Sequence, residues 1–215
     1  MIARPGSSVP LLFAVLLAGC GISEVRHLDT MKNHKAQGDA TAILQERSAC
    51  DRVDEVCAQS REISGETCLK AALGFPPLDA KARPMLDCAV EDYEVAARGP
   101  DAAARPRRLA NLGRALQARR DRGGTTPVED NTRLLQVGMD LRGSPGPEGR
   151  LGAYYAASAQ FDRVVSGTLP GDAERCAALR EATASLRGPP PTDAESHAAW
   201  ESLSRQVVQR SQACL

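Results

Sequence analysis

The sequence predicts an all-α protein built from stacked antiparallel helical hairpins, an α-solenoid that disulfide bonds staple together. Aromatic residues make up only 3% of the 215 residues, whereas the helix-favouring residues alanine, leucine, arginine, glutamate and glutamine dominate the composition. Apolar residues recur at spacings of three and four, which is the period of a helix face. Short segments rich in glycine and proline separate these stretches, so neighbouring helices are expected to fold back on one another.

Four short helices are expected in the first third of the chain, near residues 24–37, 39–48, 51–59 and 65–74. Ser60 to Gly65 is interpreted as a turn between the last two of these helices. Such a turn would let 51–59 and 65–74 pack as a hairpin.

Two longer helices are expected near residues 79–98 and 102–121. Leu109, Leu112 and Leu116 fall on one face of the second helix, and Gly123-Gly124 ends it. The apolar positions of the first helix follow the same spacing: Ala82, Met85, Ala89, Tyr93 and Ala96.

Four more helices complete the prediction, near residues 127–142, 149–166, 172–187 and 193–212. Thr126 and Glu129 form a capping box with Pro127 at the first helical position, and Thr192 with Glu195 repeats the box. The segments 143–149 and 188–191 are rich in glycine and proline, so they are expected to be loops.

The chain has an unbroken apolar run from Leu11 to Ala18, and the last two residues of the run begin the motif Leu17-Ala18-Gly19-Cys20. The run is too short to span a bilayer, which takes about 20 residues, and it follows the positive charge of Arg4 as in an export signal. The four residues ending at Cys20 resemble the lipobox of bacterial lipoproteins. The resemblance implies a signal peptide at 1–19, a lipidated Cys20 and a tether or first helix at 20–38, and Gly21 after the cysteine favours the outer membrane, facing the periplasm. The alternative is an ordinary signal peptide followed by a free or disulfide-bonded cysteine.

Six cysteines remain when Cys20 is assigned to the lipid: Cys50, Cys57, Cys68, Cys88, Cys176 and Cys214. An even number agrees with export, because disulfides persist in an oxidising compartment such as the periplasm. Zinc is the rival use, but structural zinc sites usually contain closer cysteine pairs. We therefore expect disulfide bonds and no metal.

Six cysteines allow fifteen pairings, and spacing removes a few of them. On one continuous helix, Cys50 and Cys57 would lie about 10.5 Å apart along the axis, too far for a disulfide unless the chain breaks between them. The favoured pairs are therefore Cys57–Cys68, Cys50–Cys88 and Cys176–Cys214. The last pair requires that the final helix bend or end early.

The region 39–142 is expected to be helical repeats, and 150–215 is expected to form C-terminal hairpins. Part of the region 39–142 resembles tetratricopeptide repeats. Tyr93 lies between small residues and is followed by Pro100, as in the second helix of a repeat. The next repeat begins with leucine at 109 where the family has tryptophan. The remaining matching positions are Ala89, Ala96, Leu112, Gly113 and Leu116. The alternative is an irregular helical bundle without true repeats.

The chain carries 27 basic and 27 acidic residues, and this balance argues against nucleic acid as a partner. No nucleophile elbow, phosphate-binding loop or metal-ligating histidine pair is present in the sequence. We therefore expect a protein that is not an enzyme and has no cofactor. A cluster of arginines between 98 and 122 is either a basic surface for a partner or a helix face neutralised by neighbouring acids.

The predicted function is that of a lipid-anchored adaptor, which holds protein partners of an envelope assembly on a concave helical surface. Lipoproteins of this kind assist outer-membrane, pilus, secretion or cell-wall machinery, as the resemblance implies. The residues predicted to bind a partner are Tyr93, Arg105, Arg108, Tyr154 and Tyr155. The alternative is an enzyme or a small-ligand-binding lipoprotein with a cleft between helices.

Overall fold

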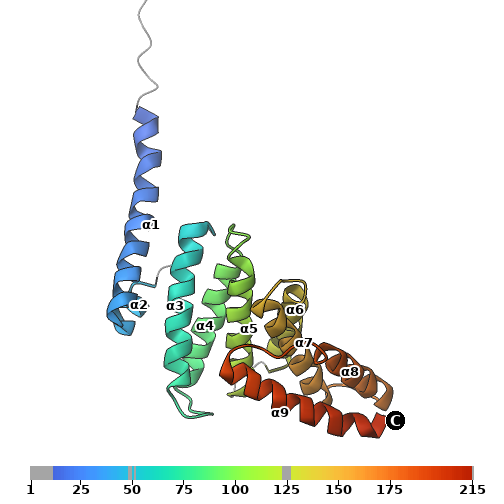
Figure 1. Ribbon diagram of the computed structural model, residues 1–215. Helices are drawn as coiled ribbons and strands as arrows, with labels where there is room; N and C mark the ends of the chain where they lie inside the picture. The colour runs from blue at the N-terminus through green and yellow to red at the C-terminus, as the bar shows by residue number, and fades with distance from the viewer. Residues whose placement is uncertain (1–11, 48–49, 51, 123–126, 215) are drawn as a thin grey trace, which may run out of the picture.

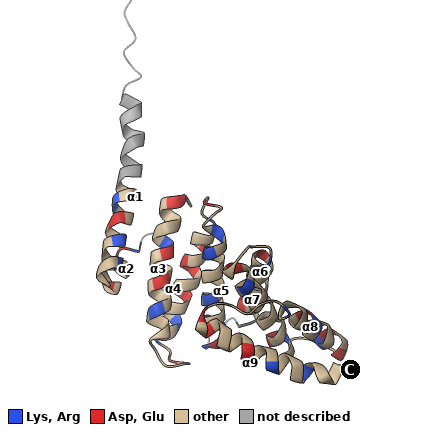
Figure 2. Ribbon diagram, in the orientation of Figure 1, with Lys and Arg blue, Asp and Glu red and all other residues tan. Residues whose placement is uncertain are grey.

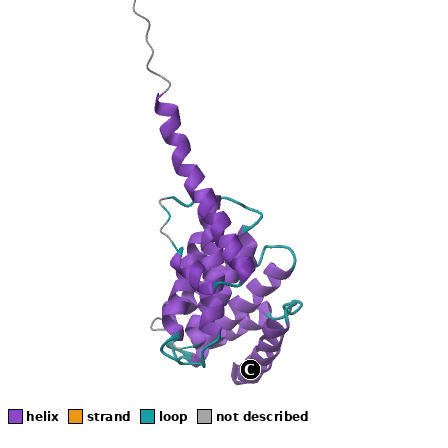
Figure 3. Cartoon of the chain, turned by 90° about the vertical axis from the view of Figure 1, so that its left-hand side faces the viewer, coloured by secondary structure: helices purple, strands orange, loops and turns teal. Residues whose placement is uncertain are grey.

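The computed structural model describes residues 12–47, 50, 52–122 and 127–214, with side chains from Ser23 onward. These residues form α-helices and one short 3-10 helix, with no strand among them (Figure 3). The all-α prediction is therefore confirmed. Residues 1–11 of the predicted signal peptide lie outside this description, as do the side chains of its remaining residues and of Cys20. None of the described helices is long and apolar enough to cross a membrane.

The helices follow one another with short connections (Figure 1). Their bounds are α1 Leu12–Gln37, α2 Ala40–Gln45, α3 Glu55–Leu73, α4 Ala82–Ala97, α5 Arg105–Asp121, α6 Pro127–Leu141, α7 Pro147–Val165, α8 Asp172–Ser185, α9 Ala194–Ser211 and the 3-10 helix Gln212–Cys214. The described helices thus match the predicted ranges to within a few residues, except at α1, which begins earlier, and at α3.

Helices α3 to α8 form three consecutive antiparallel hairpins, each packed against the next. Helix α5 also contacts α7, so the first helices of these hairpins lie on one side of the stack. Helix α1 packs beside α3 at one end, and α9 returns across α7 and α8 at the other. The stack therefore has an inner face formed by α1, α3, α5 and α7, and α9 lies on its C-terminal part.

One continuous apolar core runs through the hairpins, from Cys68 on α3 to Val207 on α9. A second, small cluster joins α1, α2 and α3 through Leu28, Met31, Ile43 and Ile63. Met31 is 1% exposed, so α1 is anchored to the stack by its last turns and not only by its connection to α2.

The predicted turn between Ser60 and Gly65 is wrong, because both residues lie inside the single helix α3. The Ser60 hydroxyl donates to the Val56 carbonyl one turn earlier, which keeps the residue within the helix. A Cβ atom on Gly65 would lie 3.3 Å from the Tyr93 ring and from Asp92 Cβ. Gly65 therefore permits a close approach of α4 to α3, and it does not break the helix.

Two of the three predicted disulfide pairs are wrong, because the bonds are Cys50–Cys57 and Cys68–Cys88, whereas Cys176–Cys214 is confirmed. Helix α3 begins only at Glu55, and the Asp54 carboxylate caps it by accepting from the Cys57 N–H. Because Cys50 thus lies outside the helix, the Cα atoms of Cys50 and Cys57 come within 5.9 Å.

The other two bonds join helices that pack as neighbours. Cys68 on α3 faces Cys88 on α4 across an antiparallel hairpin. Helix α9 ends at Ser211, and the 3-10 turn that follows brings Cys214 to Cys176 on α8. The final helix thus ends early, as this bond requires.

Candidate functional site

The inner face carries a groove of about 660 Å³ between α1, α3 and α5. Glu55, Gln59, Glu62 and Glu66 of α3 line it at spacings of four, three and four, so they form one polar stripe along the helix. Basic residues of α1 and α5 line the opposite walls, and Figure 2 shows charges of both signs along α3 and mainly basic residues along α5. The groove is therefore lined by charged residues of both signs together with apolar residues such as Leu69 and Leu73.

Arg108 of α5 binds Glu55 and Glu62 of this stripe. Its side chain is 1% exposed. Its Nη1 and Nη2 donate to the two carboxylate oxygens of Glu55 at 3.1 and 2.5 Å, and its Nε donates to Glu62 at 3.4 Å. The hydrogen bonds from Arg108 lower the pKa of Glu55 and outweigh the opposing effect of burial. Arg107 also pairs with Glu62.

Two lysines bind Glu66, the last residue of the stripe. Lys35 of α1 and Lys70 of α3 donate to the two oxygens of Glu66 at 2.5 and 2.7 Å. Burial is the largest single effect and raises the pKa of Glu66, but the two lysines together lower it further than burial raises it. Lys32, on the same wall, makes no ion pair with any residue that the structure describes.

A smaller hollow of about 240 Å³ continues the groove between α5, α7 and α9. Leu73 and Arg114 line both cavities. Glu195, in the first turn of α9, forms an exposed ion pair with Arg114, and both residues line this hollow. The chain therefore covers the C-terminal half of its own inner face, while the α3–α5 half has no helix over it within the described residues.

The residues predicted to bind a partner are mostly buried. Tyr93, Tyr154 and Tyr155 are 2%, 4% and 2% exposed, and burial raises the pKa of all three hydroxyl groups. Tyr155 donates to the Ala110 carbonyl and Tyr154 accepts from Gln117, so both hydroxyls join α7 to α5. With Arg108 also buried, only Arg105 of the five is exposed.

Most of the arginine cluster is neutralised inside the stack, as the second interpretation of the sequence holds. Arg119 donates to Asp130 of α6 and to Asp87 of α4. Arg120 donates to Asn131 of α6 and to Ser158 of α7, and Arg122 donates to the Phe75 carbonyl. These arginines tie neighbouring helices together and do not form a free basic surface.

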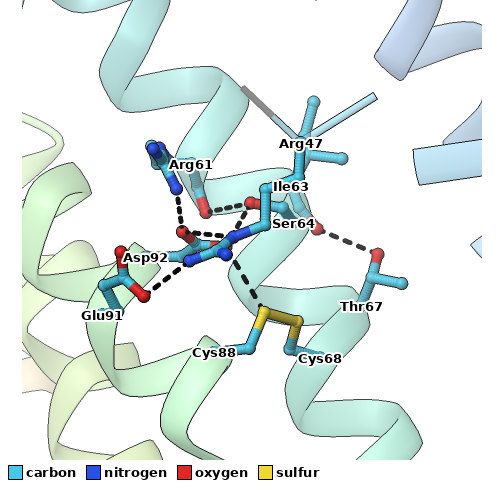
Figure 4. The surroundings of a disulfide bond; sticks show 9 residues. All are labelled: Arg47, Arg61, Ile63, Ser64, Thr67, Cys68, Cys88, Glu91 and Asp92. Atoms are coloured by element: carbon cyan, nitrogen blue, oxygen red, sulfur yellow. Dashed lines mark hydrogen bonds and ion pairs between the residues drawn. A yellow bond between two sulfur atoms is a disulfide. The ribbon is translucent and has the colours of Figure 1, made fainter. Parts of the chain in front are cut away.

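A buried carboxylate lies behind the groove, where sequence reasoning placed no functional residue. Asp92 of α4 has no exposed side-chain surface, and it accepts from Arg47 Nε, Arg61 Nη1 and Ser64 Oγ (Figure 4). Its Oδ2 also lies 3.7 Å from Cys88 Sγ of the Cys68–Cys88 disulfide. The cluster joins the segment after α2 to α3 and α4, and its sulfur atoms are committed to the disulfide.

The three histidines lie apart from this groove. His27 Nδ1 lies 3.2 Å from Glu46, and His197 Nε2 lies 3.4 Å from Glu201. His34 Nδ1 is buried without a hydrogen-bond partner among the described residues. Comparison with protein-family models, with curated proteins and with solved structures gives no match to this chain.

Proposed function

We propose that the protein is a lipid-anchored adaptor that holds a segment of a partner protein in the groove between α1, α3 and α5. The observation that carries the proposal is the contrast between the two halves of the inner face. Helix α9 lies on the α5–α7 half, whereas the α3–α5 half forms a groove of about 660 Å³ that no described helix covers. Stacked helical hairpins commonly bind partners along such a face.

The charges of the groove indicate an acidic partner segment. Six basic and four acidic side chains line it. Glu55, Glu62 and Glu66 already have basic partners, whereas Lys32 has none among the described residues. A carboxylate of a partner would add an ion pair at Lys32 without leaving a buried charge alone.

The location is proposed from the sequence. The motif ending at Cys20 would place the protein at the outer membrane, and three disulfides agree with an oxidising compartment. Several acyl chains on one residue give stable anchoring, because each buried methylene contributes about 0.8 kcal/mol. The anchor would hold the groove near other envelope proteins at a high effective concentration.

Site-specific photo-crosslinking in cells tests this proposal. A crosslinking amino acid at Gln59 or Asn111 lies within the groove, and one at the exposed Gln136 on α6 serves as the control. We expect discrete adducts at 59 and 111 and none at 136. Lys32→Glu should weaken the adducts, and Cys20→Ser should release the protein from the membrane. Equal labelling at all three positions would contradict a groove-bound partner.

A further inference from the structure

A pocket of about 360 Å³ lies between α6, α7 and α8, and it is called the α6–α8 pocket below. Helices α6 and α8 both pack against α7, whose buried residues Ala156 and Gln160 form the floor of the pocket. None of its lining residues is shared with the groove or with the hollow that continues it. Its volume is within the range of small-molecule sites, about 300–1,000 Å³, so it would serve a function separate from partner binding.

The α8 side of the pocket carries a carboxylate that a buried amide holds in place. Gln160 is 7% exposed, and its Nε2 donates to Glu181 Oε2. Its Oε1 accepts from Arg163 Nη1 at 2.9 Å, so the amide is fixed from both sides. Glu181 itself is exposed, and it forms no ion pair with any residue that the structure describes. Its negative charge is therefore available to a cation that enters the pocket.

The α6 side carries an available cation. Arg142, the residue that follows α6, is exposed and lines the pocket, and its guanidinium has no acidic partner in the described part of the chain. Arg142 and Glu181 thus line one pocket from different helices without pairing with each other. A ligand that contacts both must carry an ammonium group and a carboxylate at its two ends.

Apolar side chains line the space between the two charges. Leu135 and Met139 of α6 and Ala184 of α8 belong to the walls, and Met139 is 55% exposed. Removing such surface from water is favourable, so an apolar ligand body would supply affinity that exposed charges alone do not. We propose that the α6–α8 pocket binds a short zwitterionic peptide of apolar residues, whose ammonium group contacts Glu181 and whose carboxylate contacts Arg142.

The separation of the two charges favours a peptide over a single amino acid. Both charged groups of a free amino acid are attached to one carbon atom, whereas the ends of an extended dipeptide lie about 7 Å apart. The guanidinium of Arg142 suits the carboxylate end, because its parallel N–H donors match the two oxygens.

Binding can be measured with the dipeptide L-alanyl-L-leucine as the probe. The full chain is labelled with ¹³C in its methionine methyl groups, and the Met139 resonance is identified by its loss in Met139→Leu. We expect the dipeptide to shift this resonance saturably. N-acetyl-L-alanyl-L-leucine lacks the ammonium group, L-alanyl-L-leucinamide lacks the carboxylate, and free leucine cannot contact both sides of the pocket. Each should therefore bind at least about threefold more weakly than the dipeptide.

Two neutral variants test which charge each end of the peptide contacts. Glu181→Gln keeps a side-chain oxygen for Gln160, and it should weaken binding of the dipeptide at least about threefold but leave binding of the N-acetyl probe unchanged. Arg142→Gln should weaken binding of the dipeptide in the same way and leave binding of the amide probe unchanged. Arg180→Gln is the control, because Arg180 is exposed on α8 and does not line the pocket. Equal losses for the dipeptide and the blocked probe would overturn the assignment of the two ends.

A pair of leucine substitutions on α8 localises the binding. Ala184→Leu fills the pocket from an exposed position, whereas Ala173→Leu places the same side chain outside it. We expect the first to lower the affinity for the dipeptide at least about threefold and the second to leave it unchanged. No saturable shift in the wild-type protein, equal binding of the four probes, or unchanged affinity in a folded Ala184→Leu variant would each overturn the proposal. The comparison of the four probes needs no variant that must fold.

Discussion

Arg61 of α3 and Asp92 of α4 form an ion pair of 2.5 Å between Nη1 and Oδ1, in which the carboxylate has no exposed surface. Ser64, one turn along α3, donates to the other oxygen, and Arg47 donates to both. A buried carboxylate is tolerated only when charged and polar partners compensate for the loss of water. The pair therefore fixes how α3, α4 and the segment after α2 meet.

Asp92→Ala should lower the free energy of unfolding by about 3–5 kcal/mol, because it leaves two guanidinium groups around an empty site. The matched control is Glu91→Gln on the same helix, which removes one exposed partner of Arg47 and should cost less than about 1 kcal/mol. Urea unfolding with the disulfides intact measures both values. Similar losses for the two variants would show that Asp92 is not a structural centre.

Gly138 of α6 should be intolerant of alanine, because α7 lies directly against it. A Cβ atom there would lie 2.6 Å from the Ala156 N and 2.9 Å from the Gly152 carbonyl oxygen, and these backbone atoms cannot rotate away. We expect Gly138→Ala to lower the free energy of unfolding by about 1–3 kcal/mol. Gly143→Ala, where a Cβ atom would meet nothing within 4 Å, is the control and should be neutral to within about 1 kcal/mol. Equal tolerance at both positions would contradict the close α6–α7 packing.

The disulfides should differ in their contribution to stability, because they close loops of different length. Cys176–Cys214 closes 38 residues and Cys50–Cys57 closes 7. The loop-entropy relation gives about 4 and about 2 kcal/mol, respectively. Paired serine variants, compared by urea unfolding, should show this order.

Loss of the Cys176–Cys214 bond, which closes the longer loop, should also destabilise α9 locally. Hydrogen exchange along α9 should accelerate more in the Cys176→Ser/Cys214→Ser protein than in the Cys50→Ser/Cys57→Ser protein. The reason is that Cys214 fixes the end of α9 to α8. Unchanged exchange in α9 would mean that its packing alone holds it.

The helices could be predicted because their signals are local. Pro127 begins α6 as predicted. The predicted cap of α9 was one residue off, because Asp193 and not Thr192 accepts from the Ser196 N–H, and α7 begins at Pro147, inside the predicted loop. The prediction failed at α3, where Ser60 and Gly65 were interpreted as a turn. Gly65 instead makes room for the Tyr93 ring of α4, which the sequence alone does not reveal. The disulfide pairing failed for two reasons: the false turn suggested Cys57–Cys68, and α3 begins only at Glu55, which leaves Cys50 free to reach Cys57.

The groove was harder to predict than the fold. Tyr93 lines the groove, and Tyr154 and Tyr155 line the hollow that continues it, but all three are at most 4% exposed and also belong to the core. A periodic signal was present, because residues 55, 59, 62 and 66 are all polar and share one helix face. It was hidden by the false turn, which placed residues 55 and 59 on one helix, 66 on another and 62 between them. The Arg61–Asp92 pair joins residues 31 positions apart, and no local pattern could indicate it.

The acids of the groove should make stability depend on pH. The pKa of Glu55 is lowered in the folded protein, chiefly by the hydrogen bonds from Arg108. Its contribution to stability is therefore fully present above the ordinary glutamate pKa, about 4.3, and is lost as the pH falls through the lower, folded value. Glu66, whose pKa is also lowered, acts in the same direction.

Glu55→Gln should thus be less stable than the wild-type protein at pH 7, and the difference should shrink as the pH falls from about 5 to about 3. Urea unfolding of both proteins across this range measures the difference. Glu129→Gln on α6 is the control for the loss of one carboxylate, because Glu129 is exposed and makes no ion pair with the described residues. A difference between wild type and Glu55→Gln that stays constant down to pH 3 would show that Arg108 does not stabilise the charged form of Glu55. The bidentate contact at the mouth of the groove would then have no electrostatic role in holding α5 against α3.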